Sequence, residues 1–346
     1  MKNEIFRRLS ALALGLALLL NAAPLPQAFA VEDDTDASSS DSADSTDTAD
    51  KTAVTTADND PTVTAAAANA PALDATAALL VSPESDMVLY EKNADEKRYP
   101  ASTTKIMTAL LTLENVSDLS AVVTAEASDF ENVTSDSSNA GIKVGEQVTV
   151  KDLLYALMLP SANEAAYMLA RHVGGSWEQF VDMMNERAAE LGCTGTHFCN
   201  PCGLHEDDHY TTAHDLYLIA KEAMKDATFR DIVSTVQHRM AKTNLHEERI
   251  ILTTNQLIFS SFQPWSYANC LGIKTGHTSQ AGNCFVGYAE YGDAKLFSVV
   301  LGCSNSSKEY PTIAASFTDT KSLCQWGFEN FTSKTLARQG EEVTYT

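Results

Sequence analysis

The chain has 346 residues, a formal net charge of −22 and 44% hydrophobic residues. A balance this acidic argues against nucleic acid or an anionic membrane surface as the main binding partner. The seven cysteines are an odd number and cannot all pair within one chain, and the sequence leaves open which of them, if any, form disulfides.

The N-terminal segment has the order of a secretory signal peptide. Basic residues precede an apolar run at 9–20, and the small-residue triplet Ala28-Phe29-Ala30 closes the segment. The apolar run is too short to span a bilayer comfortably. We therefore predict that residues 1–30 are a signal peptide, that cleavage leaves no transmembrane anchor, and that the mature protein is extracytoplasmic, either secreted or held in the cell envelope.

Acidic and small polar residues dominate the next segment, 31–75. It consists mostly of Asp, Ser, Thr and Ala, with no aromatic residue and no apolar periodicity. Such a segment cannot bury enough apolar surface to offset the entropy lost on ordering. We predict a disordered acidic tether here, one folded catalytic domain at 76–331, and a short tail at 332–346.

The folded domain is predicted to begin with two strands and a helix. Apolar runs at 78–81 and 87–90, separated by a short polar loop, predict a β-hairpin. Pro100 then precedes a helix that is apolar on nearly every face from 106 to 113, which is typical of a helix in the middle of a domain. Ser102 is expected at or near the N-cap of this helix.

Helices predominate in the middle of the chain. One helix stops at Pro160, and the next is expected at 164–172. Three pairs of residues have the spacing of a helix N-cap and its partner: Thr149 with Asp152, Ser176 with Gln179, and Thr212 with Asp215.

The last third of the chain returns to strands and ends in a helix. Strands are predicted at 249–253, 271–275, 284–291 and 295–301, and the closing helix at 311–331. This order of elements predicts an α+β domain. Its antiparallel sheet would be built from both chain ends, with a helical cluster between them.

The first helix carries the first chemical motif, Ser102-x-x-Lys105. Three residues apart, the hydroxyl and the amine lie on the same face of the helix, about one turn from each other. An alkoxide near a helix N-terminus is stabilised by the dipole, and a desolvated lysine can be neutral enough to accept a proton. The pair is therefore a candidate nucleophile and base.

Two further short motifs follow: Ser161-x-Asn163 and Lys274-Thr275-Gly276. The first lies in a turn between two helices, and the second lies on a strand whose glycine would let a ligand lie close to the backbone. Ser137-Ser138-Asn139 also matches the serine motif. It lies in a polar stretch with no helix stop before it, so we favour Ser161.

The chain resembles a known protein family over more than the three motifs. The resemblance covers five stretches: 100–110, 148–154, 200–204, 209–212 and 272–276. There the chain resembles the serine-type D-alanyl-D-alanine carboxypeptidases, low-molecular-weight penicillin-binding proteins related to the serine β-lactamases. The resemblance implies a β-lactamase/transpeptidase-like fold and a cofactor-free hydrolase that trims the terminal D-alanine from peptidoglycan stem peptides. It also implies an acyl-enzyme, β-lactam antibiotics such as penicillins as inhibitors, and a part in cell-wall biosynthesis and cell shape.

The resemblance also implies a role for each motif residue. Ser102 would be the acylated nucleophile and Lys105 its base; Ser161 and Asn163 would relay protons and bind the substrate amide; Lys274 and Thr275, with Gly276, would hold the terminal carboxylate; and the backbone N–H groups of Ser102 and His277 would form the oxyanion hole.

The chain departs from the family's pattern near these motifs. Ala162 and Glu164 stand where the family often has glycine and aspartate, and Cys202 stands where it often has histidine.

Two lysines that converge on one site disfavour each other's charge. We expect Lys105 to lose its proton and Lys274 to stay charged.

The same sequence suggests three alternatives. Cysteines and histidines at 193–209 could be drawn as a zinc site, but their spacing lacks the paired regularity of strong metal signatures, so no metal is expected. A β-lactamase would need a group that activates water for fast deacylation, and no E-x-x-L-N element follows Asn163. The third alternative, a wall-binding module with a vestigial active site, is disfavoured by the intact set of three motifs.

Overall fold

The computed structural model describes residues 52–53, 69–134, 137–259 and 263–331. These residues all belong to one contact unit, Ala49–Thr346. The predicted signal peptide, the predicted C-terminal tail and most of the predicted tether lie outside the described residues. Within the described part of the chain, no helix is long and apolar enough to cross a membrane.

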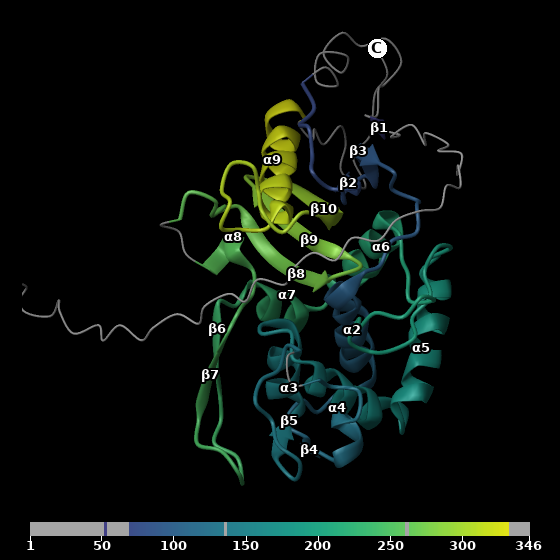
Figure 1. Cartoon of the computed structure of the whole chain (residues 1–346), viewed down its shortest axis with the longest axis vertical. Helices are drawn as coiled ribbons and strands as arrows, with labels where there is room; N and C mark the ends of the chain where they lie inside the picture. The colour runs from purple at the N-terminus through teal and green to yellow at the C-terminus, as the bar shows by residue number, and fades with distance from the viewer. Residues whose placement is uncertain (1–51, 54–68, 135–136, 260–262, 332–346) are drawn as a thin grey trace, which may run out of the picture. The chain divides into compact units, whose positions relative to one another are not determined.

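A six-stranded antiparallel sheet runs in the order β1-β3-β2-β10-β9-β8 (Figure 1). Its strands are β1 (Thr52–Ala53), β2 (Ala77–Ser82), β3 (Met87–Lys92), β8 (Cys270–Thr278), β9 (Gly282–Tyr291) and β10 (Ala294–Cys303). The predicted hairpin of β2 and β3 is present, and β2 pairs with β10, the last strand. The sheet is thus built from both ends of the chain, which confirms the predicted α+β architecture.

The ordered structure includes residues that the sequence assigned to the tether. The short strand β1 pairs with β3 at the outer edge of the sheet. Ala75 is fully buried, and its N–H donates to Asp319 Oδ2 at 2.7 Å. Asp74 accepts hydrogen bonds from the N–H and the hydroxyl of Ser304. Contacts between the chain and the domain therefore occur before residue 76, where we predicted the domain to start.

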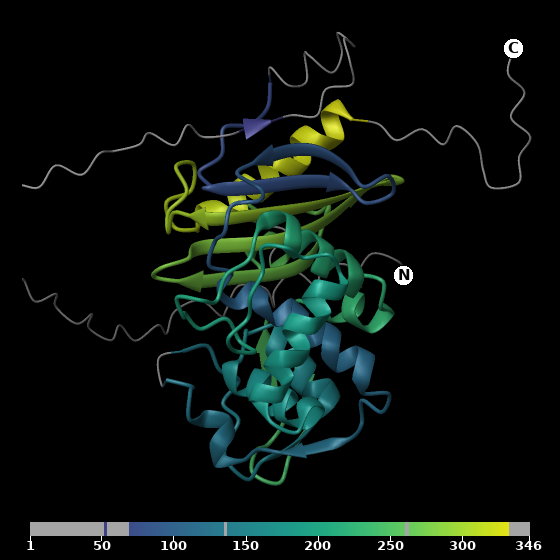
Figure 2. The same ribbon diagram turned by 90° about the vertical axis from the view of Figure 1, so that its right-hand side faces the viewer.

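The two faces of the sheet are buried by different elements. Side chains alternate along a strand, so Leu79 and Val81 on β2 pack into the helical cluster, whereas Ala78 and Leu80 pack into a second core with α9 (Ala315–Asn330). Figure 2 shows α9 and the helices of the middle of the chain on opposite sides of the sheet. Burial on both faces explains the nearly continuous apolar sequence of β2.

The helical cluster surrounds one central helix. Its members are α2 (Lys105–Asn115), α3 (Val150–Met158), α4 (Asn163–Gly174), α5 (Trp177–Glu190), α6 (Ala213–Ala223) and α7 (Ala227–Ser234). Ile106, Met107 and Ala109 of α2 are fully buried. The prediction of a buried central helix is therefore confirmed.

The start of this helix differs from the prediction. Ser102 is not an N-cap, because it lies inside a short 3₁₀ turn, η1 (Ala101–Thr104), that precedes α2. The turn is closed by Pro100, whose carbonyl oxygen accepts from the N–H and from the hydroxyl of Thr103, at 3.3 and 2.7 Å. A 3₁₀ turn tightens the first turn of the helix and carries Ser102 to its surface.

Side-chain caps start three of the other helices, as predicted. The N–H of Asp152 donates to Thr149 Oγ1 at 3.1 Å, that of Gln179 to Ser176 Oγ at 3.3 Å, and that of Asp215 to Thr212 Oγ1 at 3.0 Å. Each hydroxyl satisfies an N–H that has no partner within its own helix.

Short elements outside the main sheet were not all predicted. Strands β4 (Val122–Thr124) and β5 (Gln147–Thr149) pair with each other, as do β6 (Gln237–Met240) and β7 (Arg249–Leu252). The strand predicted at 249–253 is therefore present but lies outside the main sheet. A one-turn helix, α8 (Gln256–Phe259), and a second 3₁₀ turn, η2 (Ala127–Phe130), were also missed.

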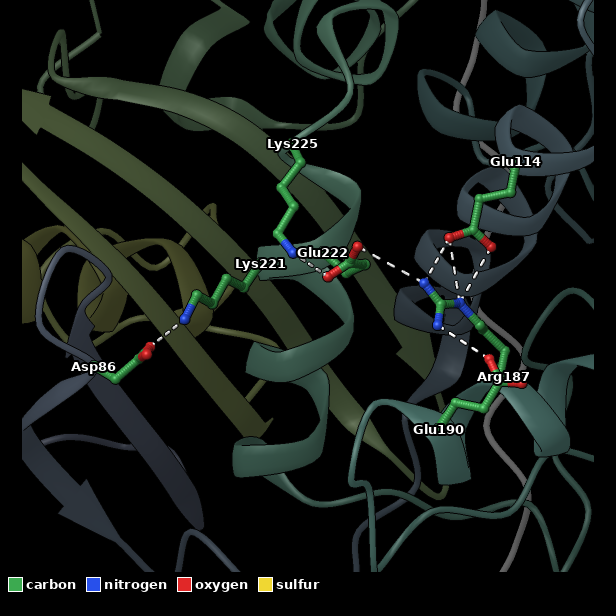
Figure 3. A network of polar contacts seen from close by, with 7 residues as sticks. All are labelled: Asp86, Glu114, Arg187, Glu190, Lys221, Glu222 and Lys225. Carbon is green, nitrogen blue, oxygen red and sulfur yellow. Dashed lines mark hydrogen bonds and ion pairs between the residues drawn. The ribbon is translucent and has the colours of Figure 1, made fainter.

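Ion pairs on the surface connect three helices of the cluster (Figure 3). Arg187 on α5 lies 2.7 Å from Glu114 on α2 and 3.7 Å from Glu222 on α6. Lys221, also on α6, pairs with Asp86 in the turn between β2 and β3. Partly exposed pairs of this kind contribute about 0–1 kcal/mol each, so they orient the helices while burial of the apolar faces supplies most of the stability.

Candidate active site

A cleft of about 600 Å³ lies between the helical cluster and strand β8. Six of the eight predicted site residues line it: Ser102, Ser161, Asn163, Thr275, Gly276 and His277. The other two, Lys105 and Lys274, are buried beside it, with 0% and 1% of their surfaces exposed. The fold therefore brings together three motifs that are far apart in the sequence.

Lys105 is the first residue of α2, and its Nζ lies within hydrogen-bond distance of three acceptors. These are Ser102 Oγ at 3.0 Å, Asn163 Oδ1 at 2.7 Å and the carbonyl oxygen of Cys202 at 2.7 Å. An ammonium has three protons to donate. A neutral amine keeps two of them, which suffice for Asn163 and Cys202, and turns its lone pair toward Ser102.

The environment of Lys105 favours this neutral form. Burial lowers the pKa of Lys105 from its ordinary value of 10.5 to about 8. The electrostatic effects of the Cys202 and Glu164 side chains act in the opposite direction. Desolvation disfavours the charged form of an amine. The amine can therefore accept the proton of the Ser102 hydroxyl at mildly alkaline pH.

Ser161 lies in the turn between α3 and α4, in a backbone conformation with φ of +66°. Few residues other than glycine adopt this left-handed region. Its Oγ is buried and has no hydrogen-bond partner among the described residues. Ser161 thus lines the cleft with an unpaired hydroxyl, and no hydrogen bond joins it to Lys105 or Ser102 in this structure.

Glu164 fixes the loop that forms one wall of the cleft. Its Oε1 accepts the N–H of Ala140 at 2.7 Å, and burial raises the pKa of this carboxyl group. The carbonyl oxygen of Ser138 accepts the N–H of Asn163 at 2.9 Å. Ser137 and Ser138 also line the cleft. The second match to the serine motif, at 137–139, is therefore hydrogen-bonded to the first through Asn163.

The Lys274 side chain enters the site from β8. Its Nζ donates to the carbonyl oxygen of Thr275 at 2.9 Å. Burial, and then the charge of Lys105, lower the pKa of Lys274 well below its ordinary value. Both effects act against the charge that we expect on Lys274, and no carboxylate of the described residues lies within ion-pair distance of it. An anion bound in the cleft would raise that pKa again.

Thr254 is a cleft residue that the sequence did not indicate. Its Oγ1 lies 2.6 Å from Thr275 Oγ1, and both side chains line the cleft. Thr254 follows β7 and has no motif around it. The N–H of Thr254 donates to the carbonyl oxygen of Leu159 at 3.0 Å, so a contact with a distant segment fixes the residue whose hydroxyl meets Thr275.

Two glycines permit the close contacts of the site. A Cβ on Gly276 would lie 2.9 Å from the carbonyl oxygen of Pro100 and 3.1 Å from the backbone nitrogen of Ser102. Gly203 has φ of +87°, and a Cβ there would lie only 1.9 Å from the carbonyl oxygen of Ala101. Strand β8 and the Cys202 loop can therefore both approach η1, so the backbone next to His277 lies close to that of Ser102.

A buried histidine supports the loop that carries Cys202. His209 Nδ1 accepts the N–H of Cys199 at 3.0 Å, so its Nε2 carries the proton that is donated to Thr104 Oγ1 at 2.8 Å. Burial, together with nearby cations, lowers the pKa of His209 to about 3. This imidazole is neutral and connects the loop to the end of η1.

The cysteines and histidines do not form a metal centre in this structure. All seven cysteines are free thiols. Over the described ranges, no group of three or more His, Cys, Asp or Glu side chains is arranged to hold a metal ion. Cys202 contributes its carbonyl oxygen, and its thiol is buried against Asn200 Oδ1 at 3.4 Å.

Comparison with known proteins gives consistent results. A family model described as D-alanyl-D-alanine carboxypeptidase matches residues 64–305. Among curated proteins, the chain is 32% identical to the D-alanyl-D-alanine carboxypeptidase DacF of Bacillus subtilis, over 78% of the chain and 66% of the relative. It is 34% identical to DacC of Escherichia coli, over 77% of the chain and 64% of the relative. The chain thus spans slightly less than two thirds of the length of these two relatives.

Solved structures show the same similarity. The crystal structure of a Streptomyces DD-transpeptidase matches 75% of this chain and 99% of its own, with a TM-score of 0.67 and 33% identity. A D-alanyl-D-alanine carboxypeptidase from Mycobacterium tuberculosis matches 75% of this chain and 93% of its own, with a TM-score of 0.67 and 30% identity.

Proposed function

The chain belongs to the D-alanyl-D-alanine carboxypeptidase family, and on this basis we propose that it is an exported serine carboxypeptidase that trims peptidoglycan stem peptides. Its substrate would end in D-Ala-D-Ala, and the enzyme would release the terminal D-alanine in the cell envelope. Penicillins and other β-lactams would acylate the same serine.

The observation that carries the proposal is the position of Lys105 Nζ among Ser102, Asn163 and Cys202. Neutral Lys105 takes the proton of Ser102, and Ser102 Oγ attacks the carbonyl carbon of the penultimate D-alanine. The peptide C–N bond then breaks, and the leaving amine takes up a proton. Water hydrolyses the acyl-enzyme in the second half of the reaction and restores the serine hydroxyl.

Ser161 and Asn163 have the groups needed for proton transfer and substrate binding. The unpaired hydroxyl of Ser161 is available to donate a proton to the leaving amine, or to pass one on from Lys105. Asn163 uses Oδ1 for Lys105. Its amide nitrogen is then left to donate to a substrate carbonyl.

The remaining motif residues suit the two ends of the scissile bond. We propose that Lys274 and Thr275 bind the terminal carboxylate. The protonated amine of Lys274 and the hydroxyl of Thr275 can each donate a hydrogen bond to it. The backbone N–H groups of Ser102 and His277 would stabilise the oxyanion, because the close approach that Gly276 allows keeps their backbones near each other.

Labelling with a fluorescent penicillin, followed by peptide mapping, tests the assignment. The adduct should lie on Ser102 and should be absent from Ser102→Ala, and the unmodified enzyme should release D-alanine from a D-Ala-D-Ala peptide. An adduct on Ser161 or Ser137 would overturn the assignment of the nucleophile. Rapid loss of the label by hydrolysis, without release of D-alanine from peptides, would show a β-lactamase instead.

A further inference from the structure

A second hollow, of about 500 Å³, adjoins the active-site cleft. Gln280 lines both cavities. Tyr99 lines the second hollow and His205 lines the cleft, and their rings lie edge to face with centroids 4.6 Å apart. The two cavities are thus neighbours at the end of β8, and none of the motif residues lines the second one.

Cations line this second hollow although the protein as a whole is strongly acidic. Lys97 and Arg98 line it, opposed by the single carboxylate of Asp207. The Nζ of Lys97 lies 3.8 Å from the centre of the Tyr210 ring. Among the described residues, no carboxylate lies within ion-pair distance of Lys97. Its charge is therefore held over an aromatic face and is not neutralised by a carboxylate.

Arg98 adds a second donor group. One of its terminal nitrogens pairs with Glu96 at 2.6 Å, which offsets part of its charge, and the other donates to the carbonyl oxygen of Lys97 at 3.2 Å. Its Nε has no hydrogen-bond partner among the described residues. The guanidinium thus keeps unused hydrogen-bonding capacity beside the ammonium of Lys97.

The direction in which a substrate would run leads from the cleft to this hollow. If the terminal carboxylate lies at Thr275 and the scissile bond at Ser102, the acyl part must extend along β8 toward Gln280. Strand β8 is the last strand of the sheet, so its outer edge can pair with an extended peptide. Four residues extend about 13 Å at about 3.3 Å per residue, and β8 ends at Thr278, two residues before Gln280.

We propose that Lys97 and Arg98 form an anion subsite that binds a carboxylate on the acyl part of the substrate, about four residues from its free C-terminus. The inference rests on the proposed function, because it uses the direction of the bound peptide. The subsite would select acidic peptides over neutral ones of the same length. It would act through binding, since it lies outside the reacting centre.

A matched pair of peptides tests this subsite. Both end in D-Ala-D-Ala, and they differ only in glutamate or glutamine at the fourth position from the C-terminus. The acidic peptide should have a kcat/KM about two- to fivefold higher, which is the effect of one exposed charge pair. The preference should shrink with added salt. Lys97→Gln should reduce it toward one, whereas Lys295→Gln, on β10 away from the hollow, should leave it intact.

The outcomes separate the two proposals. If both peptides are cleaved equally by the unmodified enzyme, the subsite is wrong and the carboxypeptidase assignment stands. The subsite is also wrong if the preference survives in Lys97→Gln. If neither peptide releases D-alanine, the proposed function fails, and the subsite fails with it.

Discussion

Lys105 Nζ lies 3.0 Å from Ser102 Oγ, and the lysine side chain is fully buried. The sequence separation of three residues would bring the two groups together on any regular helix. What the fold adds is the environment: Asn163 and the Cys202 carbonyl occupy the remaining donors of the amine. The lone pair of neutral Lys105 is thereby directed to the serine.

Activity should therefore rise with pH through the pKa of Lys105. Since that pKa is lowered to about 8 and we propose the neutral amine as the base, kcat/KM should fall about tenfold for each pH unit below 8 and level off above it. The profile should be measured from pH 5.5 to 9.5 with a D-Ala-D-Ala peptide. A flat profile, with chemistry shown to limit the rate, would assign the base to another group.

Lys105→Arg tests the same point without removing the positive charge. An arginine stays protonated at every accessible pH, so it cannot accept the serine proton. Activity should fall by about 10²–10⁴-fold, and the variant should keep its thermal midpoint within a few degrees. Retained activity would show that Lys105 acts only through its charge.

The hydrogen bond between Thr254 and Thr275 leads to a prediction about substrate ends. Thr275→Val removes the hydroxyl that we propose as a donor to the terminal carboxylate and nearly conserves volume, so kcat/KM should fall about tenfold or more on a peptide acid. For the C-terminal amide of that peptide, kcat/KM should fall by less. Thr254→Val should also lower kcat/KM on the peptide acid, but by less, because it removes only the partner that orients Thr275. Equal cleavage of acid and amide by the unmodified enzyme would exclude a carboxylate clamp.

Two glycines with nearly the same φ provide a test of the Cys202 loop. Gly192 has φ of +86° and no atom within 4 Å of a new Cβ, whereas Gly203 has φ of +87° and would meet Ala101 at 1.9 Å. Gly192→Ala should cost about 1 kcal/mol of unfolding free energy. Gly203→Ala should cost about 1–3 kcal/mol more.

The two variants should also differ in activity. The clash at Gly203 displaces the backbone next to Ser102, and a shift of about 1 Å can cost about 100-fold in rate. Gly192→Ala should keep its activity. Urea unfolding and D-alanine release on both variants provide the comparison, and equal effects of the two substitutions would show that the close contact at Gly203 is unimportant.

Local patterns in the sequence were sufficient for the architecture. The hairpin of β2 and β3, the buried helix α2 and the three side-chain caps follow from alternation, apolar runs and hydroxyl spacing, and all are present. Short elements such as β4, β5 and β6 were missed because a strand of three or four residues gives too little periodicity. The 3₁₀ turn at Ser102 was missed because an N-cap and a 3₁₀ start have similar sequences.

The parts of the site that were missed depend on contacts between distant segments. Nothing around Thr254 indicates that its hydroxyl meets Thr275. The carbonyl oxygen of Cys202 has no side-chain signature, although it is one of the three acceptors of Lys105. The sequence shows that two lysines converge, but not that burial is the first cause of the lowered pKa of Lys274.

Asp319 on α9 provides a prediction about stability and pH. Burial raises the pKa of its carboxyl group from 3.8 to about 6, although the N–H of Ala75 donates to it. Above pH 6 the folded protein buries a charged carboxylate, which costs stability. As the pH falls from 6 toward 4, the folded state takes up a proton that the unfolded chain does not, so stability from this group rises.

Asp319→Asn keeps an acceptor for the Ala75 N–H and removes the charge. It should therefore be more stable than the unmodified protein at pH 7–8, by up to about 3 kcal/mol, and the difference should disappear by about pH 4. Urea unfolding at several pH values measures it, with Asp293→Asn in the exposed turn between β9 and β10 as the control. Because Asp293 is exposed, its replacement controls for the loss of one formal charge. If Asp319→Asn has the pH dependence of the unmodified protein, Asp319 does not take up a proton between pH 6 and 4, and the anchor between Ala75 and α9 is not sensitive to pH.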